Sequence, residues 1–167
     1  MKGEGLKDRL FLLVTSGFGL GLLPGAPGTF GAVVGLIWHL AAWAAGFGAT
    51  AIRLWCLAGV ILFLVLHYAL TPWAQRYWNE SDPKHYIIDE IPGYLMVPVL
   101  SLPAVRIEHI LLGFVIERIC DIIKLPVARY FDRKVHNATG VVMDDIIAGI
   151  YAAVILSLAI RFIPPLF

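Results

Sequence analysis

Long apolar runs, separated by short polar segments, make up most of the chain. A membrane-spanning helix needs about 20 apolar residues, and runs near this length occupy positions 29–47, 52–70, 107–124 and 141–163. A fifth run, at 86–102, is shorter and contains Pro92 and Pro98. Because proline interrupts helical hydrogen bonding, we expect this run to be kinked or only partly inserted. The pattern predicts an all-α, polytopic membrane helix bundle with four to five spanning helices, in which residues 1–167 form a single domain.

Residues 15–31 depart from this pattern because they are rich in glycine and proline. Pro24 and Pro27 lack the backbone N–H that a helix interior requires, and each glycine adds a cost in backbone entropy. Non-helical backbone is tolerated at membrane depth only where protein or a wet cavity surrounds it. We therefore expect an N-terminal Gly/Pro-rich loop that is re-entrant or interfacial.

Composition supports the membrane class. Hydrophobic residues make up 59 % of the chain and charged residues 15 %. Soluble domains average about 45–50 % hydrophobic and 25 % charged residues. Mean hydropathy is +0.80. The net charge of +1 excludes broad electrostatic attraction to nucleic acid. Cys56 and Cys120 lie within apolar runs without the spacing of a metal site, which indicates buried structural thiols.

Lysine and arginine are distributed unevenly between the two predicted membrane faces. With the N-terminus in the cytoplasm and five spans, the far side holds three basic residues, Arg53, Arg106 and Arg161. The cytoplasmic side holds nine: Lys2, Lys7, Arg9, Arg76, Lys84, Lys124, Arg129, Arg133 and Lys134. Since cytoplasmic loops are enriched in basic residues, this orientation is favoured. It brings the Gly/Pro segment to the cytoplasmic face.

Six acidic residues lie inside or at the edges of the apolar runs: Asp89, Glu90, Glu117, Asp121, Asp144 and Asp145. A carboxylate near the bilayer core costs roughly 2.5 kcal/mol or more unless it is paired, hydrated or bound to a metal. The pairs Asp89–Glu90 and Asp144–Asp145 each open an apolar segment. Two interpretations remain open: a favourable interaction with the helix dipole, or ligation of a hard cation such as Mg²⁺, which prefers oxygen ligands.

Two glycines accompany these acidic pairs. Gly93 and Gly149 each lie four residues after a carboxylate, Asp89 and Asp145 respectively. On a helix this spacing places glycine and carboxylate on the same face. We expect each glycine to permit the close approach of a neighbouring helix or of a lipid headgroup.

Arg118, Asp121 and Lys124 follow one another at three-residue spacing along one side of a predicted helix. One interpretation is an intrahelical salt bridge between Arg118 and Asp121. In the other, Asp121 binds a metal while the two basic side chains face a phosphate. The segment 129–136 mixes basic and aromatic residues, so we expect a loop that touches anionic lipid, a phosphate site, or both. Within it, His136 is a candidate for proton transfer.

Three blocks of the sequence resemble the bacterial phosphatidylglycerophosphatase A family: GFGLGLLPGAPGTFGA at 17–32, IIDEIPG at 87–93, and the run 113–150. Their order and spacing also match, and together they span nearly the whole chain. Departures from the usual family pattern are Glu117, where an aromatic residue is usual, Leu125 in place of proline, and Asn137 in place of glycine.

The resemblance implies a Mg²⁺-dependent lipid phosphatase of the bacterial cytoplasmic (inner) membrane. Such enzymes act in phospholipid biosynthesis, where they hydrolyse phosphatidylglycerophosphate to phosphatidylglycerol and inorganic phosphate. The family's acidic positions correspond to five expected metal ligands: Asp89, Glu90, Asp121, Asp144 and Asp145. Four of these are expected to be catalytic: Asp89, Glu90, Asp121 and Asp145. Phosphate is expected to bind Thr29 at a helix start, together with Arg118, Lys124, Arg129, Arg133 and His136. The phospholipid would keep its acyl chains in the bilayer.

Two other functions remain open. A membrane cation transporter or channel would use the acidic residues as an ion path, but an ion path should cross the full membrane depth, whereas these residues cluster at one predicted face. A metal-dependent phosphatidyltransferase also uses membrane carboxylates, but its long Asp-Gly…Ala-Arg…Gly…Asp…Asp signature is absent. A Cys-based phosphatase is also disfavoured. Such enzymes need an arginine six residues after the nucleophilic cysteine, and neither Cys56 nor Cys120 is followed by one at that spacing. Metal-assisted hydrolysis is therefore the favoured chemistry, and the sequence does not indicate an oligomeric state.

Overall fold

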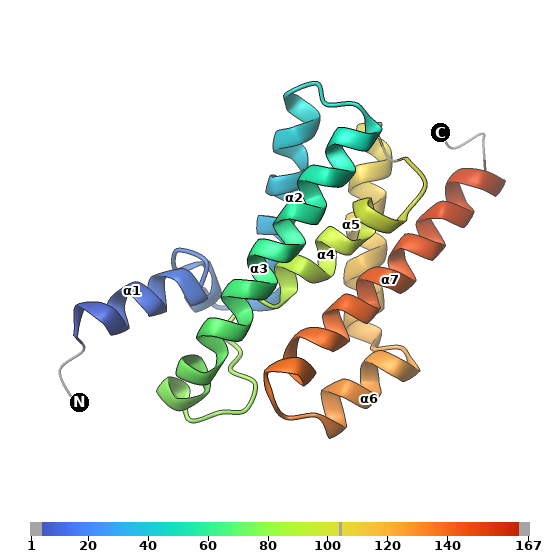
Figure 1. The fold of residues 1–167 in the computed structure, drawn as a ribbon. Helices are drawn as coiled ribbons and strands as arrows, with labels where there is room; N and C mark the ends of the chain where they lie inside the picture. The colour runs from blue at the N-terminus through green and yellow to red at the C-terminus, as the bar shows by residue number, and fades with distance from the viewer. Residues whose placement is uncertain (1–4, 104, 164–167) are drawn as a thin grey trace.

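The computed structural model describes residues 5–103 and 105–163, and every regular element in this part of the chain is a helix. The predicted all-α class is therefore confirmed for these residues. A short 3₁₀ helix, η1 (Leu20–Leu22), lies between the first two α-helices. The α-helices shown in Figure 1 are α1 (Leu6–Thr15), α2 (Pro27–Ala44), α3 (Ala49–Trp78), α4 (Glu90–Leu100), α5 (Ile107–Ile123), α6 (Pro126–Lys134) and α7 (Ala138–Phe162).

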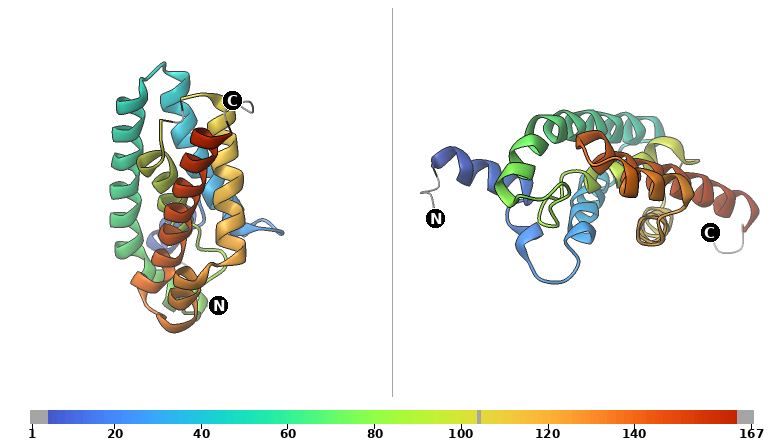
Figure 2. Two further views of the ribbon diagram at one scale, coloured as in Figure 1. Left: turned by 90° about the vertical axis from the view of Figure 1, so that its right-hand side faces the viewer. Right: turned by 90° about the horizontal axis from the view of Figure 1, so that it is seen from below.

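The short helix α4 lies at the centre of the bundle. It contacts α2, α3, α5 and most extensively α7 (Figure 2). Seven of its eleven residues are buried, among them Tyr94 and Leu95, which are at most 1 % exposed. By contrast, α1 projects from the side of the bundle (Figure 1) and packs Phe11 edge-on against Trp73 of α3. The core therefore consists of α4 and the helices that surround it.

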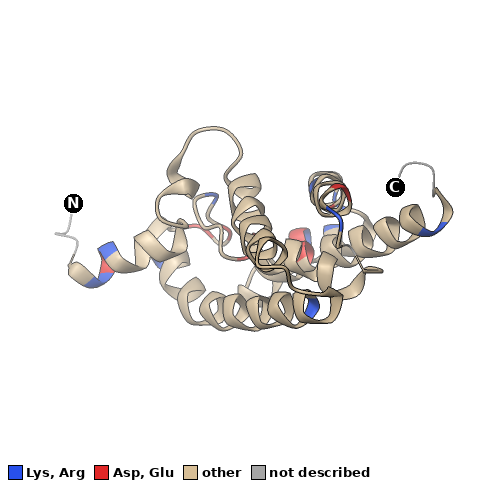
Figure 3. Ribbon diagram, turned by 90° about the horizontal axis from the view of Figure 1, so that it is seen from above, with Lys and Arg blue, Asp and Glu red and all other residues tan. Residues whose placement is uncertain are grey.

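Three helices, α2, α3 and α7, are long and apolar enough to cross a membrane. Figure 3 shows that they are free of charged residues over most of their length. The eleven residues of α4 reach only roughly 16 Å at 1.5 Å per residue, about half the hydrocarbon thickness of a bilayer. The 17 residues of α5 lie at the lower limit for a spanning helix. The expected count of four to five spans is not confirmed.

Proline and capping residues set several helix boundaries. Pro27 and Pro126 occupy the first turns of α2 and α6. Backbone N–H groups in a first turn have no partner within the helix, so proline costs no hydrogen bond there. Lys124 ends α5 in a left-handed conformation, with φ of 49°. Asn137 caps α7, its side-chain oxygen accepting the N–H of Gly140 at 3.1 Å. The sharp turns on both sides of α6 direct the chain from the end of α5 to the start of α7.

Two helices were not expected from the hydrophobic pattern. The sequence predicts a loop at 129–136, but residues up to Lys134 belong to α6, so this prediction is wrong for most of the segment. The nine residues of α6 pack on α7 and bury Ala128. The apolar and charged residues of α6 do separate to opposite faces of the helix, but nine residues are fewer than the roughly 12–15 that make an isolated helix stable. The ten residues of α1, which include a charged first turn, are similarly short.

The Gly/Pro segment folds back on the residues that precede α4. Residues 17–19 all have positive φ, which turns the chain sharply after α1. The N–H of Ile87 donates to the carbonyl of Thr15 at 3.1 Å, and Nδ1 of His85 lies 2.9 Å from the carbonyl oxygen of Gly21. These contacts fix the segment beside the start of α4. Its depth relative to a bilayer stays a prediction.

Six of the acidic residues of the apolar runs, those between Asp89 and Asp145 other than Glu108, gather at one end of the bundle, whereas Glu108 lies at the other end, at the start of α5. The starts of α2, α4 and α7 and the end of α5 all lie in the lower half of Figure 1. The starts of α3 and α5 and the end of α7, which carry Arg53, Arg106 and Arg161, lie at the upper end. Lys2, which the sequence analysis assigns to the cytoplasmic face, lies outside the described residues. The two ends of the bundle therefore differ in chemistry.

Helices α4 and α7 approach each other closely at two glycines. A Cβ atom at Gly149 would overlap the carbonyl oxygen of Gly93, and a Cβ atom at Gly93 would lie 2.8 Å from the Cβ of Asp145. The close neighbour expected at these glycines is therefore a helix. Glu90 lies about one turn before Gly93, and Asp145 lies one turn before Gly149. The glycine contact consequently brings carboxylates of α4 and α7 to the same place.

Replacing Gly149 by alanine should destabilise the bundle by about 1–3 kcal/mol, the usual cost of overpacking, because the new methyl group meets the backbone of Gly93. Thermal unfolding of the purified protein in detergent measures this effect. Gly48→Ala is a suitable control, because no atom lies within 4 Å of a Cβ atom at that position. Equal unfolding temperatures for the two variants would show that the α4–α7 contact is looser than described.

Candidate active site

Three carboxylates from three helices meet at the acidic end of the bundle. Glu90 begins α4, Asp121 lies in the last turn of α5, and Asp145 lies two turns into α7, beyond the first turn in which a carboxylate meets the helix dipole. Each offers an oxygen atom, and the three oxygens lie within 4.8 Å of one another. All three side chains are largely shielded from solvent, and Asp145 is only 4 % exposed. We call Glu90, Asp121 and Asp145 the carboxylate cluster.

Arg118 is held against this cluster by three acidic side chains. Its Nη2 lies 2.9 Å from Oε2 of Glu90, and its Nη1 lies 3.5 Å from Oδ2 of Asp121. Glu117 accepts two further hydrogen bonds, from Nε at 2.7 Å and from Nη2 at 2.6 Å. The intrahelical Arg118–Asp121 pair considered from the sequence is therefore present, as part of a larger network. Three carboxylates, those of Glu90, Glu117 and Asp121, therefore share a single guanidinium.

The donor set of the cluster fits a hard divalent cation. Asp145 forms no ion pair within the described part of the chain, so Arg118 balances only part of the cluster's charge. Carboxylates held this close repel one another, and a cation between them removes that repulsion. Oxygen atoms from a few carboxylates, completed by water and a substrate phosphate, are the usual ligands of Mg²⁺. The cluster can therefore bind a metal ion.

A polar pocket of about 220 Å³ adjoins the cluster. Its wall contains Glu90 and Asp145 of the cluster, together with other charged residues and the start of α2: Pro27, Gly28, Asp82, Lys84, Asp89, Lys124 and Asp144. Asp89 and Asp144 are each 5 % exposed. One buried oxygen atom of each, Oδ1, finds no hydrogen-bond partner among residues 5–103 and 105–163. These oxygens leave acceptor capacity for a ligand in the pocket.

Lys124 supplies positive charge at the pocket wall. Its ammonium group pairs with Asp144 and lies 3.0 Å from Oδ1 of Asp132. Burial lowers the pKa of this ammonium, but the hydrogen bonds and attraction from Asp144 and Asp132 outweigh burial and raise the pKa above its ordinary value. Lys124 therefore stays charged over the physiological pH range.

The other expected phosphate ligands do not line the polar pocket. Thr29 sits in the first turn of α2, whose residues Pro27 and Gly28 line the pocket. Arg129 lies on α6 and donates to the carbonyls of Ile123 and Lys124, both at 3.1 Å, which holds the end of α5.

Arg133 is exposed on α6. His136 follows α6 and lines a smaller pocket that also contains Asp82 and Asp144. Arg118 does not line the polar pocket.

Asp82 was missed by the sequence analysis. It lines both pockets but belongs to the polar connection between α3 and α4, so a search for acids within apolar runs passes over it. The one available signal is its position seven residues before Asp89, in a short loop that must return to the start of α4. The role of Glu117 as a partner of Arg118 was also missed.

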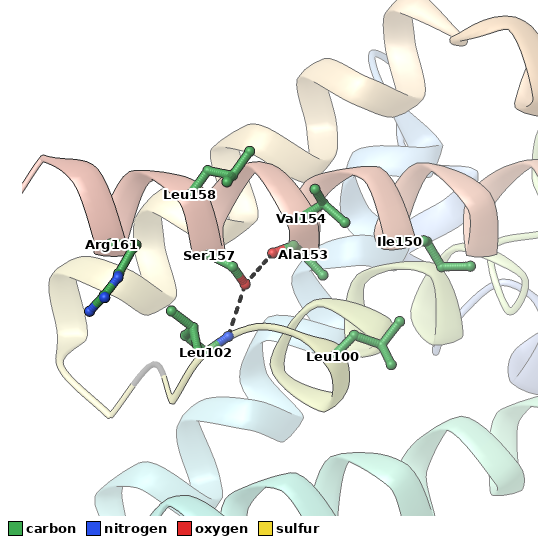
Figure 4. Close-up of a pocket in the computed structure, with 8 residues that line it drawn as sticks. All are labelled: Leu100, Leu102, Ile150, Ala153, Val154, Ser157, Leu158 and Arg161. Atoms are coloured by element: carbon green, nitrogen blue, oxygen red, sulfur yellow. Dashed lines mark hydrogen bonds between the residues drawn. The ribbon is translucent and has the colours of Figure 1, made fainter.

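A larger cavity lies on another part of the molecule. This apolar groove of about 520 Å³ runs between α7 and the end of α4. Figure 4 shows Leu100, Leu102 and Val154 around it, with Ser157 bonded to the backbone of Leu102 and Ala153. It contains no acidic side chain, and its charged residue, Arg161, lies at the end of α7 remote from the cluster. The polar pocket, and not this groove, therefore offers groups for hydrolytic chemistry.

A sequence profile described as Phosphatidylglycerophosphatase A matches residues 13–160. The match covers most of the chain and includes the whole carboxylate cluster. The chain belongs to the phosphatidylglycerophosphatase A family. The resemblance stated from three sequence blocks is thereby confirmed, and membership in this family shows an enzyme of the phosphatase class.

Individual relatives agree with the family assignment. Phosphatidylglycerophosphatase A of Haemophilus influenzae is 31 % identical over 150 residues, covering 86 % of this chain and 84 % of the relative. Phosphatidylglycerophosphatase A of Escherichia coli K12 is 32 % identical over 145 residues, covering 86 % and 80 %. A Bacteroides thetaiotaomicron protein, provisionally named a phosphatidylinositol-3-phosphatase, is 32 % identical over 152 residues, covering 89 % and 92 %. No solved structure gives a significant match.

Asp121→Asn and Asp145→Asn should each lower kcat for phosphate release by about a hundredfold or more, because losing a ligand charge weakens cation binding. Asparagine keeps the side-chain volume, so thermal unfolding in detergent should change little. Asp132→Asn is the control, since Asp132 contacts Lys124 outside the cluster, and its effect should be milder. Wild-type rates in both cluster variants would mean that the reaction occurs elsewhere.

Proposed function

We propose that this chain hydrolyses phosphatidylglycerophosphate to phosphatidylglycerol and inorganic phosphate in a Mg²⁺-dependent reaction of phospholipid biosynthesis. The observation that carries the proposal is the cluster of Glu90, Asp121 and Asp145 beside a polar pocket. Membership in the phosphatidylglycerophosphatase A family supports the substrate, since the relatives from Haemophilus influenzae and Escherichia coli bear that name. The oxygen-only donor set supports Mg²⁺.

The proposed mechanism assigns a task to each group around the pocket. Mg²⁺, when bound, would supply Lewis acidity and lower the pKa of a water ligand. Glu90, Asp121 and Asp145 would hold it, and the phosphate would occupy the adjoining pocket. The ammonium of Lys124 would offset charge on the phosphate oxygens. The first turn of α2, which includes Thr29, would direct backbone N–H groups at the same oxygens.

Asp89 and Asp144 have a second part in this proposal. Each directs an oxygen without a hydrogen-bond partner among the described residues at the wall of the pocket. They would accept hydrogen bonds from water molecules that complete the coordination of the cation, or coordinate it directly as the sequence predicts. Arg133 and His136 lie outside the polar pocket and would meet the anionic headgroups of neighbouring lipids. Arg129 would act by holding the end of α5.

The proposed setting is the inner membrane of a bacterium, with the active site facing the cytoplasm. Three apolar helices of spanning length support a membrane location, and the relatives from Haemophilus influenzae and Escherichia coli are bacterial. The excess of basic residues at the end that carries the cluster supports the orientation. In this arrangement α5 would be a fourth span, and α4 with the residues that follow it would carry the chain across a fifth time, from the end of α3 to the start of α5. A phospholipid would present its phosphate to the pocket from the side, while its acyl chains remain among the lipids.

The alternatives make different use of the same residues. A cation channel requires polar groups along the whole depth of the bundle, but the buried acidic residues lie on the helix segments at one end. At the other end, Glu108 is about half exposed and pairs with Arg106. A phosphatidyltransferase is disfavoured by the family assignment. A phosphatidylinositol phosphate is the most relevant competing substrate, because one relative carries that name.

Purified protein in mixed micelles with Mg²⁺ should release phosphate from phosphatidylglycerophosphate, and excess EDTA should reduce the rate to background until Mg²⁺ is restored. The physical reason is that an oxygen-only cluster without thiolate or imidazole ligands holds a hard cation reversibly. Phosphatidylinositol 3-phosphate serves as the comparison substrate and should react more slowly. Full turnover in EDTA would remove the metal from the proposal, and faster release from the inositol lipid would reassign the substrate.

The double substitution Cys56→Ser and Cys120→Ser should leave most of the phosphatase activity. Both thiols are buried and neither lines the polar pocket, so neither is placed to attack phosphorus. The measurement is kcat for phosphate release by folded protein. A loss of about a thousandfold would point instead to a covalent cysteine intermediate.

A further inference from the structure

Glu117 is a buried charge without an assigned task. It is 0 % exposed, does not belong to the carboxylate cluster and does not line the polar pocket. Burying a carboxylate is costly unless it is paired and hydrogen-bonded. The partner of Glu117 is Arg118, the next residue in the chain, which it contacts through both of its oxygen atoms.

Adjacent residues on a helix do not normally face each other. The side chains of Glu117 and Arg118 nevertheless meet in a two-point contact, in which Nε and Nη2 each donate to one carboxylate oxygen. A two-point contact fixes the plane of the guanidinium as well as its position. Nη2, which also donates to Glu117, lies 2.9 Å from Glu90, and Nη1 lies 3.5 Å from Asp121, so the same group reaches two members of the cluster.

This arrangement gives Arg118 a different partner from the phosphate expected from the sequence. Its side chain is 8 % exposed and lies outside the polar pocket, and its donors are directed at carboxylates. Groups that hydrogen-bond to metal ligands fix the orientation of those ligands, and removing such groups typically weakens metal binding by about 10–100-fold. Arg118 occupies that position with respect to two of the three cluster residues.

We propose that Glu117 is a positioning residue that fixes the Arg118 guanidinium between Glu90 and Asp121 and thereby sets the separation of two cation-binding carboxylates. The inference rests on the proposed function in that it takes the cluster to bind a divalent cation. It goes beyond that function by assigning Glu117 and Arg118 to the cation site and removing Arg118 from the phosphate site.

The test measures binding of Mn²⁺ alone to the purified full-length protein in detergent, by electron paramagnetic resonance titration. Glu117→Gln should weaken Mn²⁺ binding about tenfold, because one of the two contacts that orient Arg118 becomes weak or repulsive. The Mg²⁺ concentration for half-maximal phosphate release should rise by a similar factor, while KM for the lipid at saturating Mg²⁺ stays within about twofold. A purely structural role would lower the unfolding temperature and leave Mn²⁺ affinity unchanged.

Glu108→Gln is the matched control. Glu108 lies on the same helix and pairs with Arg106 at 3.4 Å, but both side chains are about half exposed and lie at the other end of α5. The same chemical change there should leave Mn²⁺ affinity unaltered. Glu117→Met repeats the loss of charge with an uncharged side chain of similar length, in case the amide alone prevents folding.

A double-variant cycle decides whether Glu117 acts through Arg118. If it does, Glu117→Gln combined with Arg118→Gln should bind Mn²⁺ no more weakly than Arg118→Gln alone. Additive losses would overturn the proposal, as would wild-type Mn²⁺ affinity in Glu117→Gln, or failure of both Glu117 variants to fold. If the wild-type protein binds Mn²⁺ but releases no phosphate, the proposed function fails, while the Mn²⁺ titrations still decide the role of Glu117.

Discussion

The contact between α4 and α7 at Gly93 and Gly149 determines where the acidic residues of this protein meet. Between membrane helices, where lipid is as apolar as leucine, association depends on close packing of small residues. Here two glycines allow the backbones to approach until a side chain would no longer fit. Because Glu90 and Asp145 lie about one turn before these glycines, the same contact that builds the core also brings two carboxylates together.

Electrostatics then works against this packing. Three carboxylates, those of Glu90, Glu117 and Asp121, contact Arg118, and Asp145, Asp89 and Asp144 add three more at the pocket wall. Like charges in a poorly hydrated site repel, so these carboxylates can all stay ionised only with further positive charge. Lys124 supplies part of it, and a bound divalent cation would supply the rest. The repulsion among the carboxylates at this end of the bundle is thus the reason that we expect it to bind a cation.

Much of this structure could be predicted from hydrophobic pattern and buried charge. The apolar runs indicated the five longer segments, and the rule that acids are rare in lipid singled out Glu90, Asp121 and Asp145. The search for long apolar runs passed over α6, whose apolar and charged residues separate to opposite faces but whose nine residues are fewer than an isolated stable helix needs. It also passed over Asp82, which lies in a polar loop. The Glu117–Arg118 contact joins adjacent residues that do not normally face each other, so its detection required the packed helices.

Locating the bound metal tests the central claim most directly. A crystal structure of the protein with Mn²⁺, recorded at a wavelength where manganese scatters anomalously, reports the ion's position without reference to activity. We predict an anomalous peak between Glu90, Asp121 and Asp145, with carboxylate oxygens at about 2.0–2.3 Å, as hard divalent cations require. A peak elsewhere, with these three carboxylates paired only to Arg118 and water, would contradict this prediction.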